Sequence, residues 1–139
     1  MANVEILRRA IDAYNARDVD AFIAYCDPRI ELHSAFAAVG GAVYHRHDGM
    51  RDFFRDFEDV WGDEVRVEPE AYFDLGESTL AFYVLHGRGR SSGADVAMPS
   101  ALVARYREGL LAFIKAYAHR EDALEDLGVS VEGLERIKP

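Results

Sequence analysis

The sequence predicts one α+β domain, in which N-terminal helices pack on a curved, mainly antiparallel sheet and a further helix follows the sheet. Two patterns predict this class. Apolar residues recur at helical spacing in three segments before residue 62, whereas residues 64–119 alternate like strands separated by short turns such as "LGES" and "EG". The 139 residues suffice for one core and are too few for two, so we treat residues 1–139 as a single domain.

The first two helices are predicted from apolar stripes and from residues that start or stop a helix. One stripe on the first helix comprises Val4, Leu7, Ile11 and Tyr14. Asp18 is a suitable N-cap for a second helix, on which Phe22, Ile23 and Cys26 face inward. This helix is expected to end at Asp27, because the residue before a proline avoids helical angles. Cys26 has no second cysteine to pair with and is expected to be a buried small apolar residue.

Two further helices flank the strands. Residues 48–61 are predicted to be helical and to stop at Gly62, and residues 120–127 are predicted to be helical and to stop at Gly128. The inward face of the first of these consists of Met50, Phe53, Phe54, Phe57, Val60 and Trp61. Strands are predicted at residues 29–35, 64–73, 78–90, 94–107 and 110–119.

The pairing of the last two strands depends on a two-residue turn at Glu108 and Gly109, which pairs Arg107 with Leu110. This register predicts two distinct faces. One face carries Met98, Ser100, Leu102 and Ala104 opposite His119, Tyr117, Lys115 and Phe113. The other carries Pro99, Ala101 and Val103 opposite Ala118, Ala116 and Ile114. The first face suits a mainly apolar pocket with a few directed polar groups. The second suits a homodimer interface, with coverage of the chain's own helices as the alternative.

Charge and composition exclude several classes of partner. Lys and Arg total 16 against 25 for Asp and Glu, and the net charge of -9 disfavours nucleic acid and anionic membranes as partners. The first thirty residues contain no uninterrupted hydrophobic run, which predicts neither a signal peptide nor a membrane span, so a cytoplasmic protein is expected. No phosphate loop or dinucleotide fingerprint occurs, and no cofactor or bound metal is expected.

Four segments carry a resemblance to a known family. The segments "AYNARDVDAFIAYCDP", "IELHSA", "HDGMRDFF" and "REDALEDLG" resemble the nuclear transport factor 2-like superfamily, in particular its SnoaL-like polyketide cyclase branch. The resemblance spans nearly the whole chain and implies a cone-shaped domain that forms dimers. The superfamily includes isomerases, cyclases, epoxide hydrolases, dehydratases and members without chemistry, so the fold alone leaves the activity open.

The sequence departs from the catalytic patterns of these relatives. SnoaL-like cyclases carry an aspartate, proposed as acid and base, where this chain has His119. A histidine near its reference pKa of about 6.5 can still exchange a proton at neutral pH. The ketosteroid isomerase groups would fall at Ala10, Ser34 and Ala101, and all three functional groups are missing. The Asp-Arg-Asp set of limonene epoxide hydrolases is also missing.

His119, Tyr117 and His33 are therefore the candidate catalytic residues, with His119 as the leading acid and base. The candidate ligand-binding residues are Tyr44, Trp61, His86, Met98, Ser100 and Lys115. For several of these residues, a purely structural role is the alternative to a role in the site. Lys115 and His119 can instead point to water at a strand end, Tyr44 can be a packing aromatic, and Trp61 belongs to a stripe expected in the core.

The sequence thus predicts a domain that binds a small apolar molecule and favours cofactor-independent proton transfer, as in isomerisation, cyclisation or dehydration. Two alternatives without turnover stay open. One is a binding or dimerisation domain whose cavity is filled by side chains, and the other is a ligand sensor with an open cavity.

Overall fold

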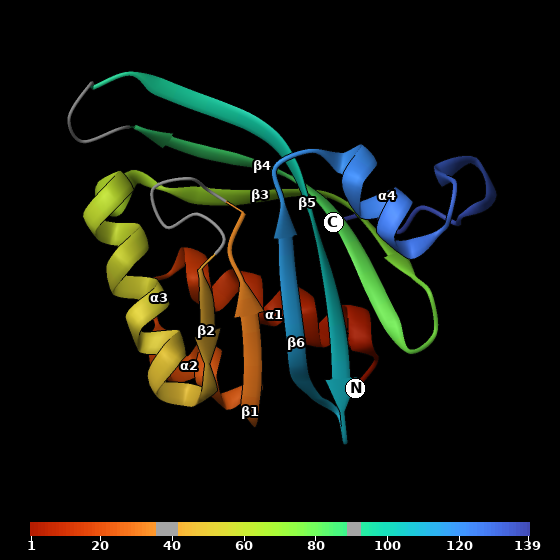
Figure 1. The fold of residues 1–139 in the computed structure, drawn as a ribbon, viewed down its shortest axis with the longest axis horizontal. Helices are drawn as coiled ribbons and strands as arrows, with labels where there is room; N and C mark the ends of the chain where they lie inside the picture. Colours follow the sequence, from red (N-terminus) through yellow and green to blue (C-terminus); the bar gives the residue numbers. More distant parts are fainter. Residues whose placement is uncertain (36–41, 89–92) are drawn as a thin grey trace.

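The computed structural model describes residues 1–35, 42–88 and 93–139 of the chain and has the predicted α+β architecture (Figure 1). Its helices are α1 (Asn3–Asn15), α2 (Val19–Ala24), α3 (Arg46–Trp61) and α4 (Arg120–Leu127). Its strands are β1 (Cys26–His33), β2 (Val43–His45), β3 (Arg66–Asp74), β4 (Ser78–Arg88), β5 (Asp95–Arg107) and β6 (Leu110–Tyr117). Two short 3₁₀ turns, η1 (Gly62–Glu64) and η2 (Val131–Gly133), complete the described elements. Residues 89 and 90 of the strand predicted at residues 78–90 lie outside the described residues.

The predicted helix signals are largely confirmed. The stripe of Val4, Leu7, Ile11 and Tyr14 is buried on α1. The Asp18 side chain caps α2 by accepting a hydrogen bond from the Ala21 backbone nitrogen at 3.0 Å. Helices α3 and α4 end at glycines with positive φ, Gly62 at 71° and Gly128 at 66°, a region that glycine enters without steric cost.

The end of the second helix differs from the prediction. Helix α2 stops at Ala24, and Cys26, Asp27 and Pro28 already belong to β1. Proline is tolerated near the start of a strand, where the ladder loses little from its missing donor. Cys26 is buried, as predicted, and burial raises the pKa of its thiol to about 12.

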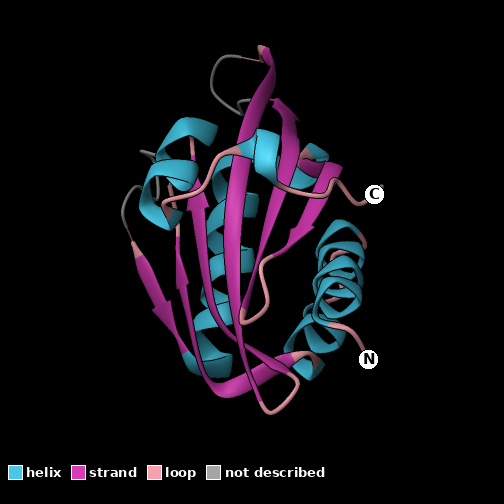
Figure 2. Ribbon diagram, turned by 90° about the vertical axis from the view of Figure 1, so that its right-hand side faces the viewer, coloured by secondary structure: helices cyan, strands magenta, loops and turns pink. Residues whose placement is uncertain are grey.

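The six strands form one mixed sheet in the order β2-β1-β6-β5-β4-β3. Strands β3 to β6 form the predicted antiparallel meander, whereas β1 runs parallel to β6 and pairs with the short β2, which the sequence did not predict. In β3 and β6, one extra residue, Glu70 and Ala112 respectively, interrupts the pairing. Such bulges bend a sheet and increase its twist. The resulting curvature is visible in Figures 1 and 2.

The two faces of the sheet are covered by different parts of the chain. We call the face toward α1, α2 and α3 the inner face and the opposite face the outer face. Figure 1 shows α4 in front of the sheet and α1 behind it. On the outer face, Ala123, Leu124 and Leu127 of α4 pack against β3, β4 and β5 together with Val131 and Leu134. The chain then crosses the sheet edge, where Ile137 exchanges two backbone hydrogen bonds with Tyr72 of β3.

The turn at Glu108 and Gly109 pairs Arg107 with Leu110 as predicted, but the predicted register beyond it is wrong. Because Ala112 is an extra residue, Ala104 pairs with Ile114 and Ala101 with Tyr117. The predicted dimer face was assembled from that register, and it does not exist as one surface. Ala101 and Val103 lie on the outer face, where the chain's own C-terminal segment covers them. Homodimer formation stays a prediction.

No described helix combines the length and apolar character that crossing a membrane requires.

The contact between Gly87 of β4 and Trp61 of α3 provides a test of this packing. A Cβ atom at Gly87 would lie 2.9 Å from Cε3 of the Trp61 indole, which packs against the inner core. We expect Gly87→Ala to lower the free energy of unfolding by about 1–3 kcal/mol, measured by urea denaturation. Gly133→Ala is the matched control, since its Cβ meets no described heavy atom within 4 Å. Equal stability of the two variants would contradict the close contact.

Candidate functional site: an apolar cavity with buried hydroxyls

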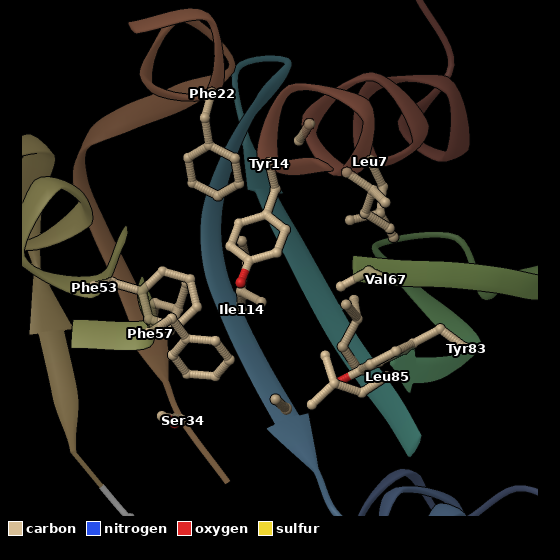
Figure 3. Close-up of a pocket in the computed structure, with 15 residues that line it drawn as sticks. Leu7, Tyr14, Phe22, Ser34, Phe53, Phe57, Val67, Tyr83, Leu85 and Ile114 are labelled. Atoms are coloured by element: carbon tan, nitrogen blue, oxygen red, sulfur yellow. The ribbon is translucent and has the colours of Figure 1, made fainter. Parts of the chain in front are cut away.

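A cavity of about 80 Å³ lies between the N-terminal helices and the inner face of the sheet (Figure 3). Most of its lining side chains are aliphatic or aromatic and come from α1, α2, α3 and every strand except β2. They are Leu7, Ala10, Ile11, Phe22, Leu32, Phe53, Phe57, Val67, Leu85, Leu102, Ile114 and Ala116. An apolar ligand gains free energy in such a cavity by leaving water.

Three hydroxyl-bearing residues, Tyr14, Ser34 and Tyr83, complete the lining. Tyr14 ends the inward stripe of α1, and its ring contacts the rings of Phe53, Phe54 and Phe57 with centroids 5.2–6.4 Å apart. Figure 3 shows its hydroxyl pointing into the cavity. This hydroxyl is buried and has no hydrogen-bond partner among the described residues. An unpaired buried hydroxyl costs about 1–3 kcal/mol, so a ligand oxygen at this point would be stabilised.

The Tyr14 ring also forms one wall of a second, surface hollow of about 230 Å³ that includes Arg17, Arg55 and Glu58. The Arg17 guanidinium lies 5.3 Å from the centroid of this ring. Removing the ring would therefore disturb two hollows at once. Replacing Tyr14 by phenylalanine keeps the wall and removes only the hydroxyl.

The polar side chains of the lining are hydroxyls, which are neutral at pH 7 and can form hydrogen bonds. Burial raises the pKa of Tyr14 well above its ordinary value, and burial followed by the nearby Tyr14 does the same for Tyr83. Both phenols therefore keep their protons at neutral pH. Among the described lining residues there is no carboxylate, imidazole, amine or thiol. The lining can bind and orient an oxygen atom, but these residues supply no general base at neutral pH.

None of the nine predicted site residues lines this cavity. Tyr117 is on the outer face, where its hydroxyl donates a 2.8 Å hydrogen bond to Asp126 of α4. His119 occupies the N-cap position of α4, is exposed, and makes no side-chain capping bond. His33 is also on the outer face, with Nε2 2.7 Å from the carboxylate of Glu31.

Three candidate binding residues also have other partners. Lys115 lies beside Tyr117, with Nζ 3.4 Å from Asp126. His86 lies on the outer side of β4, with Nε2 3.2 Å from a carboxylate oxygen of Glu68. Tyr44 is buried on β2 and donates a 2.8 Å hydrogen bond to Asp56 of α3.

The remaining three candidates are on the inner side but behind or beside the cavity. Trp61 and Met98 are half-buried and pack against the inner core. The indole Nε1 of Trp61 has no hydrogen-bond partner among the described residues. Ser100 is fully buried, and its side chain donates a 3.1 Å hydrogen bond to the carbonyl oxygen of Met98.

The bulge at Ala112 explains why Lys115 and Tyr117 of the predicted site do not face the cavity. Side chains alternate between the faces of a strand, so one extra residue turns every later side chain to the opposite face. Ile114 and Ala116 consequently line the cavity, and Lys115 and Tyr117 lie outside it. Sequence reasoning assigned Tyr14 to an apolar stripe without singling it out. A tyrosine in such an inward stripe is itself a signal, because its hydroxyl must be buried with it.

His33 lies on β1, His86 on β4 and His119 at the N-cap position of α4. No group of three or more His, Cys, Asp or Glu residues within the described ranges is placed to hold a metal ion.

Comparison with known proteins places these features in context. A family model described as SnoaL-like domain matches residues 7–114 of the chain. A nuclear transport factor 2-like protein of unknown function from Burkholderia pseudomallei K96243 is 19% identical and has a TM-score of 0.77, covering 90% of this chain and 97% of that chain. A proposed polyketide cyclase from Pseudomonas putida KT2440 is 17% identical with a TM-score of 0.71, covering 90% and 97%. TerC, co-crystallised with polyporic acid, is 18% identical with a TM-score of 0.74, covering 90% and 96%. No curated protein matches significantly.

The Tyr117–Asp126 hydrogen bond predicts a pH-dependent contribution to stability. The hydrogen bond from Tyr117, followed by that from Lys115, lowers the pKa of Asp126 in the folded protein. A lowered folded-state pKa stabilises the fold above the unfolded-state pKa, about 4, and this contribution is lost as the pH falls through the folded-state value. We therefore expect Tyr117→Phe to lower the melting temperature by a few degrees at neutral pH, and this deficit should shrink below about pH 4.

Tyr106→Phe is the matched control, because the Tyr106 hydroxyl lies 2.7 Å from the neutral hydroxyl of Thr79. Its deficit should not vary with pH across the same acidic range. Thermal melts by circular dichroism measure both variants. A deficit for Tyr117→Phe that stays constant down to about pH 3 would show that Asp126 does not depend on this bond.

Proposed function

This chain belongs to the SnoaL-like domain family, and from its cavity we propose that it binds one small, mainly apolar molecule between the N-terminal helices and the inner face of the sheet. The unpaired hydroxyl of Tyr14 carries this proposal. A buried donor aimed into an apolar space is costly when it has no acceptor, and a bound oxygen atom removes that cost.

The size and lining of the cavity support an occupant that is compact and uncharged. Its volume of about 80 Å³ suits a single ring or a short branched chain better than an extended polyketide. An ionised ligand would lose its hydration with no opposite charge among the described lining residues. The solved structure of TerC with polyporic acid supports the view that this fold can accommodate an organic molecule.

Binding without turnover accounts for the lining better than acid/base catalysis does. Isomerisation, cyclisation or dehydration needs a group that accepts a proton near neutral pH. The candidate groups for that role, His33, Tyr117 and His119, lie outside the cavity, and the phenols that line it hold their protons. We therefore propose that the chain is a carrier or sensor of a small molecule. Catalysis is the alternative, because a structurally similar protein is described as a proposed polyketide cyclase.

Toluene is a suitable first probe, because small apolar cavities accept single aromatic rings. We expect toluene at about ten times its dissociation constant to stabilise the protein by ~1.4 kcal/mol, seen as a rise in melting temperature. Ala116→Leu should remove this rise, because Ala116 lines the cavity and the larger side chain occupies it.

Ala97→Leu provides the matched control, since Ala97 is exposed on the same long hairpin and does not line the cavity. It should retain the full response to toluene. No response in the unmodified protein, or an equal response in Ala116→Leu, would contradict binding in this cavity.

A further inference from the structure

Arg120, the first residue of α4, lies against the outer face and contacts β3, β4 and β5. Its Nε donates a 3.0 Å hydrogen bond to the carbonyl oxygen of Ser100, and its Nη2 donates one of 3.0 Å to the carbonyl oxygen of Tyr83. Nη2 also pairs with the carboxylate of Glu70, and the guanidinium carbon lies 4.8 Å from the centroid of the Phe82 ring. Only 25% of the Arg120 side chain is exposed, so it is held by the sheet.

The two carbonyl oxygens lie where the pairing between strands is incomplete. Tyr83 of β4 is opposite Pro69 of β3, and proline has no N–H to donate. The bulge of β3 follows directly after this pair. Ser100 lies one residue before Ala101, where the described pairs of β5 with β6 begin. Arg120 therefore adds hydrogen bonds at two points where a neighbouring strand contributes less than a full ladder.

Tyr83 connects these contacts on the outer face to the cavity on the inner face. Its side chain lines the cavity, and Figure 3 shows it beside Leu85 and Val67. A shift of the Tyr83 backbone would move this side chain, and close-packed side chains transmit such shifts to their neighbours. The bond from Arg120 to the Tyr83 carbonyl oxygen thus holds part of the cavity wall from the other side of the sheet.

We infer that Arg120 is a positioning residue for the ligand site, and that through Tyr83 it couples ligand binding to the docking of α4 on the sheet. This inference rests on the proposed binding function and assigns α4 as the element that responds to the ligand. Coupling is reciprocal: if docked α4 strengthens ligand binding by a given factor, bound ligand strengthens the docking of α4 by the same factor.

A second contact of α4 provides an internal control. The Tyr117–Asp126 hydrogen bond also holds α4 on the sheet, but neither of its two residues lines the cavity. Tyr117→Phe should therefore loosen the helix without displacing the cavity wall. Arg120→Ala should do both.

Toluene affinity in these variants tests the inference. Dissociation constants are measured by protein-observed NMR titration, and far-UV circular dichroism verifies that each variant is folded. We expect Arg120→Ala to weaken toluene binding by about fivefold to tenfold, and Tyr117→Phe to leave it unchanged. Arg120→Lys should cause an intermediate loss, because a single ammonium nitrogen cannot span the two carbonyl oxygens as the guanidinium does. Should Arg120→Ala not fold, Arg120→Lys is compared with Tyr117→Phe in its place.

Hydrogen exchange of the α4 amides provides the reciprocal measurement. Saturating toluene should slow exchange at Leu124 and Leu127 in the unmodified protein and in Tyr117→Phe. This slowing should be lost in the Arg120 variants, because their helix no longer contacts the cavity wall through the guanidinium.

The outcomes separate this inference from the proposed function. Equal toluene affinity in the Arg120 variants and in Tyr117→Phe overturns the inference and leaves the binding function intact. Exchange at Leu124 and Leu127 that toluene does not slow in the unmodified protein overturns the inference as well. Failure of toluene to bind the unmodified protein overturns the proposed function, and with it this inference.

Discussion

One extra residue in a strand, Ala112 of β6, determines what each face of this domain can do. The pairing of β5 with β6 skips one residue of β6 between Tyr106 and Arg105. Each β6 side chain after Ala112 therefore points to the face opposite to the one it would occupy without the extra residue. Ile114 and Ala116 then face the helices, and Lys115 and Tyr117 face α4. Because sheet side chains alternate with a period of two, this single insertion exchanges a polar cavity wall for an apolar one. The apolar wall makes the cavity a binding space for neutral molecules.

The same inversion stabilises the C-terminal part of the fold. Tyr117, displaced from the cavity, instead anchors α4 through Asp126, while Ala123 and Leu124 of that helix cover the outer apolar residues. The cavity and the C-terminal covering are thus opposite sides of the same strands. A change of register in β6 would expose apolar side chains on one face and bury a charged Lys115 on the other, so the two features stabilise each other.

Local patterns in the sequence were sufficient for most elements but not for the site. Helices α1, α3 and α4 follow from their periodicity and from Gly62 and Gly128, and the turn at Glu108 and Gly109 was predicted correctly. The bulge left no such signal, because Ala112, Phe113 and Ile114 are all apolar and show no alternation to break. Strand β2 and the parallel pairing of β1 with β6 depend on contacts between distant segments. The buried hydroxyls of Tyr14 and Tyr83 became visible as a pair only when α1 was placed against β4.

The central claim, that ligands occupy the inner face after the inversion in β6, is tested most directly by methyl NMR. In protein with labelled Ile, Leu and Val methyl groups and bound toluene, nuclear Overhauser effects report which methyl groups contact the ligand. The account predicts contacts from toluene to Ile114 and Leu102, which line the cavity, and none to Val103 or Leu80 on the outer face. Contacts to Val103 or Leu80 in place of Ile114 and Leu102 would contradict it.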